Sequence, residues 1–271
     1  MKKIFYSFLT QKNSLVTVLL FFFSILSYKV NGQAIIESWA APECNSVHKI
    51  ASDSLGNAYV VYGYAAKRNI GRIDVNGVVD PSWVTYPVGT NVKAIAVDPL
   101  GNVFTANTDK TISKISPSGV VNQSWVTLAN NVNAYLICID SLGTVYTSNT
   151  DGSFSKITAS GVLIQNWATA NPAITYNDIA VDGDGNLLAC SSYNSVYGLG
   201  IVSKVASDGT LTEFFKSYPN SNIGGSGPVS IIADHYGNFY TANLNRTISK
   251  IFKTQPTYPF ESFILSWAYL G

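Results

Sequence analysis

One stretch of sequence is repeated along most of the chain, and this repeat constrains the fold more than any other feature. Val97–Trp125 reads VDPLGNVFTANTDKTISKISPSGVVNQSW, and Ile139–Trp167 repeats it almost position for position as IDSLGTVYTSNTDGSFSKITASGVLIQNW. Looser copies begin at Asp53, Asp182 and Asp234. Self-similarity at a period of a few tens of residues is the signature of repeat architectures, so it is interpreted before any single residue.

Each copy opens with a strand that ends on an Asp, followed three residues later by a Gly. Asp accepts hydrogen bonds from the backbone two residues on, and Gly adopts positive φ at little cost, so this spacing predicts a tight turn. The five pairs are Asp53 and Gly56, Asp98 and Gly101, Asp140 and Gly143, Asp182 and Gly185, and Asp234 and Gly237.

The second half of each copy has a basic residue in its third strand and an aromatic residue in its fourth. The basic positions are Arg72, Lys114, Lys156, Lys204 and Lys250. A second turn glycine follows in four copies, and a large aromatic lies six residues beyond it, at Trp83, Trp125, Trp167 and Phe215. The fifth copy replaces this turn with a longer stretch containing Pro256 and Pro259 before it reaches Trp267.

Four short strands per unit predict an all-β fold of the β-propeller class, with five complete four-stranded blades. The repeated Asp residues are 45, 42, 42 and 52 positions apart, and the blades are expected to start near residues 47, 92, 134, 176 and 228. Glu37–Ala40 resembles one further, orphan outer strand. This favours a six-bladed ring whose missing strands lie beyond Gly271, the alternative being a five-bladed ring with a spare strand.

Residues 1–32 have the pattern of a secretory signal peptide, which leaves residues 33–271 for the propeller. Lys2, Lys3 and Lys12 precede the apolar run Leu15–Leu26, and small or neutral residues follow it. The run is shorter than the roughly 20 residues that span a bilayer. We therefore expect a secreted, periplasmic or cell-surface protein with no transmembrane anchor after cleavage.

Charge and cysteine content narrow the function classes. The formal net charge is +1 and 12% of the residues are charged, so the chain lacks the strong positive potential that attracts nucleic acid. No nucleic-acid partner is therefore expected. Three cysteines leave at least one unpaired. Cys138 and Cys190 occupy repeat positions that hold Ala or Ser in three of the four other copies, which favours small buried thiols over a disulfide.

The residues that invite a catalytic or metal interpretation fit the scaffold better. Asp182–Asn186 opens like a calcium loop, but the twelfth position, where such a loop needs an acidic ligand, is Tyr193. The basic residue of the third strand is interpreted as a solvent-edge or ion-paired position facing the repeated Asp. His48 and His235 are the only histidines and fall in different parts of the repeat. We predict no catalytic residue, no metal site and no cofactor.

Variation between copies indicates where binding is expected. The two kinds of tight turn share one face of a propeller, the turn face. The links between second and third strands and between successive blades share the other, the loop face, and here they differ in length from copy to copy. Tyrosine offers stiff, amphipathic contact area for ligands. The tyrosines assigned to loop-face binding are Tyr62, Tyr64, Tyr86, Tyr176, Tyr193, Tyr197 and Tyr218.

At the level of one blade the sequence resembles NHL and streptogramin-lyase-like propeller repeats. Asn69–Ile73 (NIGRI) is similar to the N-x-I-G-R-I string of lyase-type blades, and Ser207–Phe214 (SDGTLTEF) to their D-G-T-x-T-E-F turn and outer strand. The resemblance covers residues 47–267. It implies that fold, whereas the histidine and acidic set of the lyases and the metal ligands of gluconolactonase-like propellers match no position here. The leader resembles those of exported Bacteroidetes-type proteins.

These observations favour a non-catalytic binding module whose ligand, a protein, peptide or glycan, is held by the loop face. The alternative is a metal-dependent lyase or lactonase-like enzyme on the same scaffold. A purely architectural segment of a larger surface protein is a third possibility.

Overall fold

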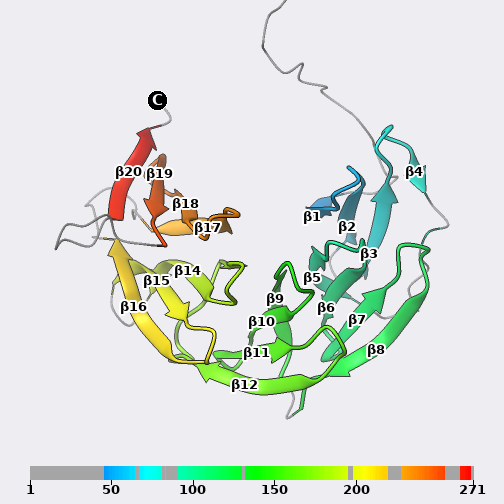
Figure 1. Ribbon diagram of the computed structural model, residues 1–271, viewed down its shortest axis with the longest axis horizontal. Helices are drawn as coiled ribbons and strands as arrows, with labels where there is room; N and C mark the ends of the chain where they lie inside the picture. Colours follow the sequence, from blue (N-terminus) through cyan, green and yellow to red (C-terminus); the bar gives the residue numbers. More distant parts are fainter. Residues whose placement is uncertain are drawn as a thin grey trace, which may run out of the picture. The chain divides into compact units, whose positions relative to one another are not determined.

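The computed structural model describes residues 46–64, 67–80, 83, 91–129, 132–194, 198–218, 227–253 and 263–269. These residues form twenty strands in five separate four-stranded antiparallel sheets (Figure 1). The predicted β-propeller with five complete blades is confirmed. The predicted signal peptide and the predicted strand at Glu37–Ala40 lie outside the described residues.

Within every sheet the strands lie side by side in chain order. The first strands are β1 (Val47–Ser52), β5 (Val92–Val97), β9 (Ala134–Ile139), β13 (Asp178–Val181) and β17 (Pro228–Ala233). The second strands are β2 (Ala58–Tyr64), β6 (Val103–Asn107), β10 (Val145–Asn149), β14 (Leu187–Asn194) and β18 (Phe239–Asn243). The third strands are β3 (Lys67–Ile73), β7 (Thr111–Ile115), β11 (Ser153–Ile157), β15 (Leu199–Val205) and β19 (Thr247–Ile251). The fourth strands are β4 (Val79–Asp80), β8 (Val121–Thr127), β12 (Leu163–Thr169), β16 (Leu211–Tyr218) and β20 (Phe263–Tyr269).

Consecutive sheets pack on each other through buried apolar side chains. The first strands are neighbours in the sequence β1, β5, β9, β13 and β17. One cluster joins Phe104 and Ala106 of the second sheet to Ile137 and Val145 of the third. Burial of apolar area is the dominant favourable term in folding, so these clusters hold sheet to sheet. No helix among the described residues is both long and apolar enough to cross a membrane.

The repeated Asp organises the turn between the first and second strands. The Asp98 carboxylate accepts hydrogen bonds from the backbone N–H of Leu100 at 2.9 Å and of Asn102 at 2.8 Å, while the Asn102 side-chain amide donates to its second oxygen at 2.7 Å. Gly101 has φ +80°, a value that favours glycine. The same pair of backbone bonds forms at Asp53, Asp140, Asp182 and Asp234. The Asp is therefore a scaffold residue, as its recurrence indicated.

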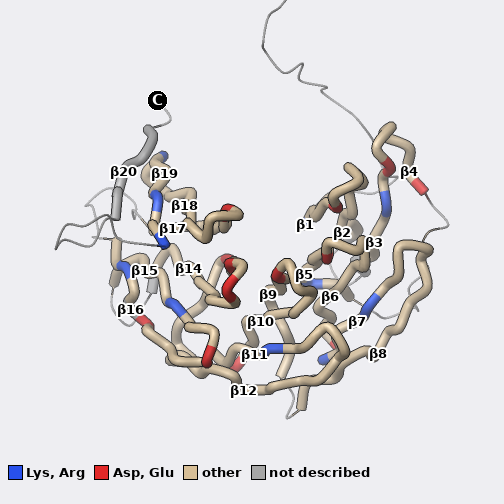
Figure 2. Tube along the Cα trace, viewed as in Figure 1, with Lys and Arg blue, Asp and Glu red and all other residues tan. Residues whose placement is uncertain are grey.

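In four of the five sheets the basic residue of the third strand is a lysine that lies against aromatic rings, which corrects the prediction that it faces the repeated Asp. Figure 2 shows these basic positions recurring along the third strands. The ammonium nitrogen of Lys156 is 5.6 Å from the centre of the Tyr146 ring and 5.2 Å from that of Trp167. Tyr146 is its cross-strand partner. Such cation–π contacts contribute about 0.5–1 kcal/mol at exposed sites. Lys114, Lys204 and Lys250 make equivalent contacts.

The aromatic residue of the fourth strand contacts the next sheet. A Cβ added to Gly161 would lie 3.0 Å from the indole nitrogen of Trp125, and one added to Gly209 would lie 2.7 Å from the carbonyl oxygen of Trp167. The indole nitrogen of Trp83 donates to the carbonyl oxygen of Pro117 at 3.1 Å. The turn glycine and the aromatic, six residues apart within one copy, therefore meet across the junction between copies.

Cys138 and Cys190 are both free thiols. Cys190 pairs with Val202 in the same way that Ala106 pairs with Ile112, which places it in the small-residue position that the repeat predicted. Burial raises the pKa of both thiols, and the charge of Asp178 raises it further. The raised pKa favours the thiol over the more reactive thiolate at both residues.

We expect Gly119→Ala to destabilise the protein strongly, because Gly119 has φ +85° and its added Cβ would meet the carbonyl oxygen of Trp83. Strain and overlap together should cost about 2 kcal/mol or more. The matched control is Gly183→Ala, where nothing lies within 4 Å and the change should stay within about 0.5 kcal/mol. Urea unfolding monitored by tryptophan fluorescence measures both, and an equal effect of the two substitutions would contradict the proposed junction.

Acid should weaken the fold through the turn carboxylates. Burial raises the pKa of Asp53, but hydrogen bonds donated by Asn57 and Tyr59 outweigh it and hold the pKa below its usual range; Asp234 behaves likewise. A carboxyl with a lowered folded-state pKa stabilises the protein above its unfolded pKa of about 3.9 and loses that contribution as pH falls through the lower folded value. The urea concentration at the unfolding midpoint should therefore decrease when the pH is lowered below about 4. The double variant Asp53→Asn, Asp234→Asn should show a smaller decrease. An unchanged slope would refute this role.

Candidate ligand-binding site

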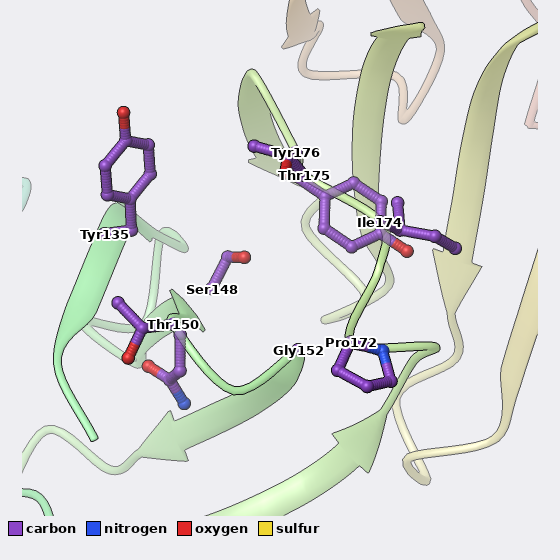
Figure 3. Close-up of a pocket in the computed structure, with 9 residues that line it drawn as sticks. Tyr135, Ser148, Thr150, Gly152, Pro172, Ile174, Thr175 and Tyr176 are labelled. Atoms are coloured by element: carbon purple, nitrogen blue, oxygen red, sulfur yellow. The ribbon is translucent and has the colours of Figure 1, made fainter. Parts of the chain in front are cut away.

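A hollow of about 190 Å³ lies on the loop face, between the third sheet and the link that leads to the fourth (Figure 3). We call it the interblade pocket. Its lining residues come from β9, from β10 and the link after it, and from the link between β12 and β13: Tyr135, Ser148, Asn149, Thr150, Gly152, Pro172, Ile174, Thr175 and Tyr176. The pocket therefore lies on the face where the sequence predicted binding.

The wall contributed by the third sheet is held by the link between β10 and β11. The backbone N–H of Thr150 donates to the carbonyl oxygen of Asn133 at 3.0 Å, and the Asn133 N–H donates to the Thr150 hydroxyl at 3.2 Å. Gly152 has φ +82°, and a Cβ there would lie 2.8 Å from the Cα of Pro172. Only glycine permits this approach, so Gly152 and Pro172 together close one end of the pocket.

Asn149 lines the pocket but its amide is fully occupied by the scaffold. Its oxygen accepts from the Thr147 hydroxyl at 2.9 Å, and its nitrogen donates to the hydroxyls of Ser153 at 3.0 Å and Ser155 at 2.8 Å. Asn107 and Asn243 make the same set of bonds in their own sheets. Asn149 is therefore a repeat residue that shapes the pocket without offering a free polar group.

The opposite wall is a link that is ordered by side chains from two sheets. The Asn171 side-chain oxygen accepts from the N–H of Ala173 at 3.0 Å, and the carbonyl of Asn171 accepts from Ile174 at 2.9 Å. The carboxylate of Glu213, on β16, accepts from the N–H of Asn171 at 2.6 Å. These bonds fix the link against the fourth sheet, so the pocket is preformed on both sides.

Tyr176 anchors this wall in the core. Its ring lies 5.3 Å from that of Phe154, and its hydroxyl donates to the Ser203 hydroxyl at 2.8 Å. Burial raises the pKa of Tyr176 to about 12, despite the Ser203 hydrogen bond that lowers it. Tyr176 is therefore a neutral, rigid part of the wall and presents ring surface rather than its hydroxyl.

The side chains that line the pocket are all uncharged. Two carboxylates of neighbouring segments are held by the scaffold: that of Asp151 accepts from the backbone and hydroxyl of Ser153, and that of Glu213 from the backbone of Asn171. The hydroxyls of Tyr135, Ser148 and Thr175 make no hydrogen bond to any residue that the structure describes. Figure 3 shows the Ser148 hydroxyl directed into the space between Tyr135 and Tyr176. The pocket thus offers free neutral donors and acceptors.

The structure separates the tyrosines predicted to bind ligand. Tyr176 lines the pocket, whereas Tyr218 is 2% exposed and donates or accepts a hydrogen bond with Thr241 in the fifth sheet. Tyr62 packs half-buried against Val60. Tyr193 is exposed on β14. Tyr86, Tyr197 and the side chain of Tyr64 lie outside the described residues. Among the described tyrosines of this set, Tyr176 lines the pocket and Tyr193 is exposed to solvent; the others are packed in the sheets.

Sequence reasoning missed Tyr135, which is 50% exposed at the pocket mouth. Its signal was available in the repeat. The position five residues before the repeated Asp holds a different residue in every copy: His48, Lys93, Tyr135, Asn177 and Val229. Applying the variation criterion to strand positions as well as to links would have included it among the candidates.

A second hollow, of about 300 Å³, lies between the first strands of the first four sheets. We call it the first-strand hollow. His48 and Lys49 line it from β1 and Asp178 from β13, with apolar residues between them. The Asp178 carboxylate already accepts from the Ser230 hydroxyl at 2.7 Å and the Ile231 N–H at 3.1 Å, and the His48 ring lies 3.1 Å from the carbonyl oxygen of Gly63. Both groups are therefore partly committed to structure.

The loop at Asp182–Asn186 behaves as a turn. Asp182 accepts from the N–H of Asp184 and of Asn186, like the other repeated Asp residues, and Asp184 forms an ion pair with Lys253. Among the described residues, no group of three His, Cys, Asp or Glu side chains is placed to hold a metal ion.

Comparison with solved structures identifies the fold. The chain superposes on a catalytically inactive virginiamycin B lyase from Staphylococcus aureus with quinupristin, in which a histidine is replaced by alanine. The TM-score is 0.60 and the identity 19%, over 78% of this chain and 68% of that one. The fold is that of the streptogramin-lyase and gluconolactonase propellers. No family model matches the chain, and no curated protein matches it.

Two further neighbours widen the range of functions on this fold. The gluconolactonase XC5397 from Xanthomonas campestris matches with a TM-score of 0.54 and 14% identity, over 77% of this chain and 73% of that one. A protein of unknown function from Bacteroides thetaiotaomicron matches with a TM-score of 0.54 and 15% identity, over 74% and 57%. The chain spans about two thirds of the length of the lyases. At these identities the comparison establishes the fold alone.

Proposed function

We propose that this protein is an exported, non-catalytic binding module whose ligand enters the interblade pocket. The observation that carries the proposal is the lining of that pocket, which combines three hydroxyls without a described partner with a neutral, preformed wall. Concave sites with a few convergent polar groups are the usual form of small-ligand sites. Export rests on the signal-peptide pattern of residues 1–32.

The position of the pocket supports the same proposal. One of its walls is the link between β12 and β13, which differs between copies, whereas the residues that recur in every copy form turns and sheet junctions. Rigid scaffolds commonly carry their binding residues on such variable links. The ordered contacts of Asn171 and Thr150 mean that little conformational entropy is lost when a ligand is bound.

A second candidate is an enzyme that works in the first-strand hollow. It is favoured by the fold shared with a lyase and a gluconolactonase, and by the placement of His48 and Asp178 around one hollow. Metal-dependent opening of a lactone that His48→Ala abolishes would establish this candidate in place of the binding module.

The binding module is tested with the purified chain on a mixed array of neutral glycans, acidic glycans and short peptides. We expect saturable binding, and Thr175→Arg should weaken it by about tenfold or more because a bulky charge then occupies the pocket edge. Thr175 is exposed, so the substitution should leave the fold intact.

The matched control is Leu142→Ser, at a position 77% exposed on the turn face. This variant should bind as the unmodified protein does. Binding that is lost in Leu142→Ser and kept in Thr175→Arg would contradict the proposal, and so would the absence of saturable binding to every probe.

A further inference from the structure

We infer that the interblade pocket takes a single neutral sugar ring, the exposed terminal residue of a glycan. This inference rests on the proposed function and names its ligand class. It is drawn from the size of the pocket, from its lack of charge, and from the arrangement of hydroxyls and one exposed aromatic ring around it.

The size of the pocket fits one small ring. Its volume of about 190 Å³ corresponds to about six waters at their liquid volume of about 30 Å³ each. Sites for drug-sized ligands run from about 300 to 1,000 Å³. A single pyranose ring suits a pocket below that range, whereas a peptide segment would make most of its contacts outside the pocket.

The lining selects against charge. A charged ligand group would be desolvated without a counter-charge, because the lining side chains are neutral. The carboxylate of Asp151 is held by Ser153, and that of Glu213 by Asn171, so neither is directed to a ligand by its hydrogen bonds. Uronic acids, amino sugars and phosphate esters should therefore bind much more weakly than their neutral counterparts.

The free polar groups are those that a polyhydroxylated ligand needs. The hydroxyls of Ser148 and Thr175 can each donate one hydrogen bond and accept others, as sugar hydroxyls can. They come from opposite walls, one from β10 and the other from the link before β13. A ring held between them would satisfy groups that the described part of the chain leaves without a partner.

Tyr135 provides the apolar contact. Its ring is 50% exposed and stands across the pocket from Ile174 and Tyr176 (Figure 3). A pyranose presents C–H groups on the faces of its ring and hydroxyls around its edge, so an aromatic ring can cover a face while hydroxyls bind the edge. Tyr135 therefore decides affinity, and Ser148 and Thr175 decide which hydroxyl pattern fits.

The test uses ligand-observed NMR with the methyl pyranosides of glucose, galactose and mannose, together with glucuronic acid and glucosamine. Saturation transfer should be seen for at least one neutral pyranoside and not for its charged counterparts. Tyr135→Ala should weaken binding by about tenfold or more, whereas Tyr135→Phe, which keeps the ring, should stay within a few-fold. Tyr236→Ala, at an exposed tyrosine on the turn face that does not line the pocket, should have no effect.

The outcomes separate this inference from the proposed function. Peptide binding that Thr175→Arg abolishes, without any sugar binding, would overturn the sugar inference and leave the binding module standing. Sugar binding that is unchanged in Tyr135→Ala, or a preference for charged sugars, would also overturn it. The stabilities of all variants are compared by thermal melting, so that a loss of binding is credited only to folded protein.

Discussion

The contact between a fourth-strand aromatic and the turn glycine of the next sheet is the constraint on which the rest of the structure depends. Gly161 and Gly209 have no room for a side chain because Trp125 and Trp167 fill it. A lysine of the same sheet also packs on the aromatic ring, as Lys156 packs on Trp167. The first four copies therefore carry both halves of a junction, and repeating the sequence repeats the packing of sheet on sheet.

Much of this scaffold could be predicted from the sequence, because aligning the five copies shows which positions recur and therefore have a structural role. The Asp-x-x-Gly turns, the five sheets and the small-residue position of Cys190 follow from that comparison. The role of the strand lysine could not be predicted, since its neighbours lie on other strands. Periodicity identifies a position as structural, but only the cross-strand pairing with Tyr146 shows that the partner is a ring.

The site was predictable to the level of a face and not to the level of residues. Link variation indicated the loop face, and the interblade pocket lies on that face. Residue choice by amino-acid type was less reliable, because Tyr218 replaces the buried Leu128 and Ala170 of other copies and Tyr176 replaces Val92 and Ala134. In both cases the repeat register, read in full, indicates a core position. The same register shows Tyr135 at a strand position that holds a different residue in every copy.

The central claim is that recurring residues build the propeller while a ligand is bound where the copies differ. Hydrogen–deuterium exchange with and without saturating neutral methyl pyranosides tests it most directly. The account predicts slower exchange of amides in residues 149–152 and 173–176, with no change at the turn amides of Leu100 and Asn102. Slowing confined to His48–Ile50 and Asp178–Ala180 would place the ligand in the first-strand hollow and contradict the account.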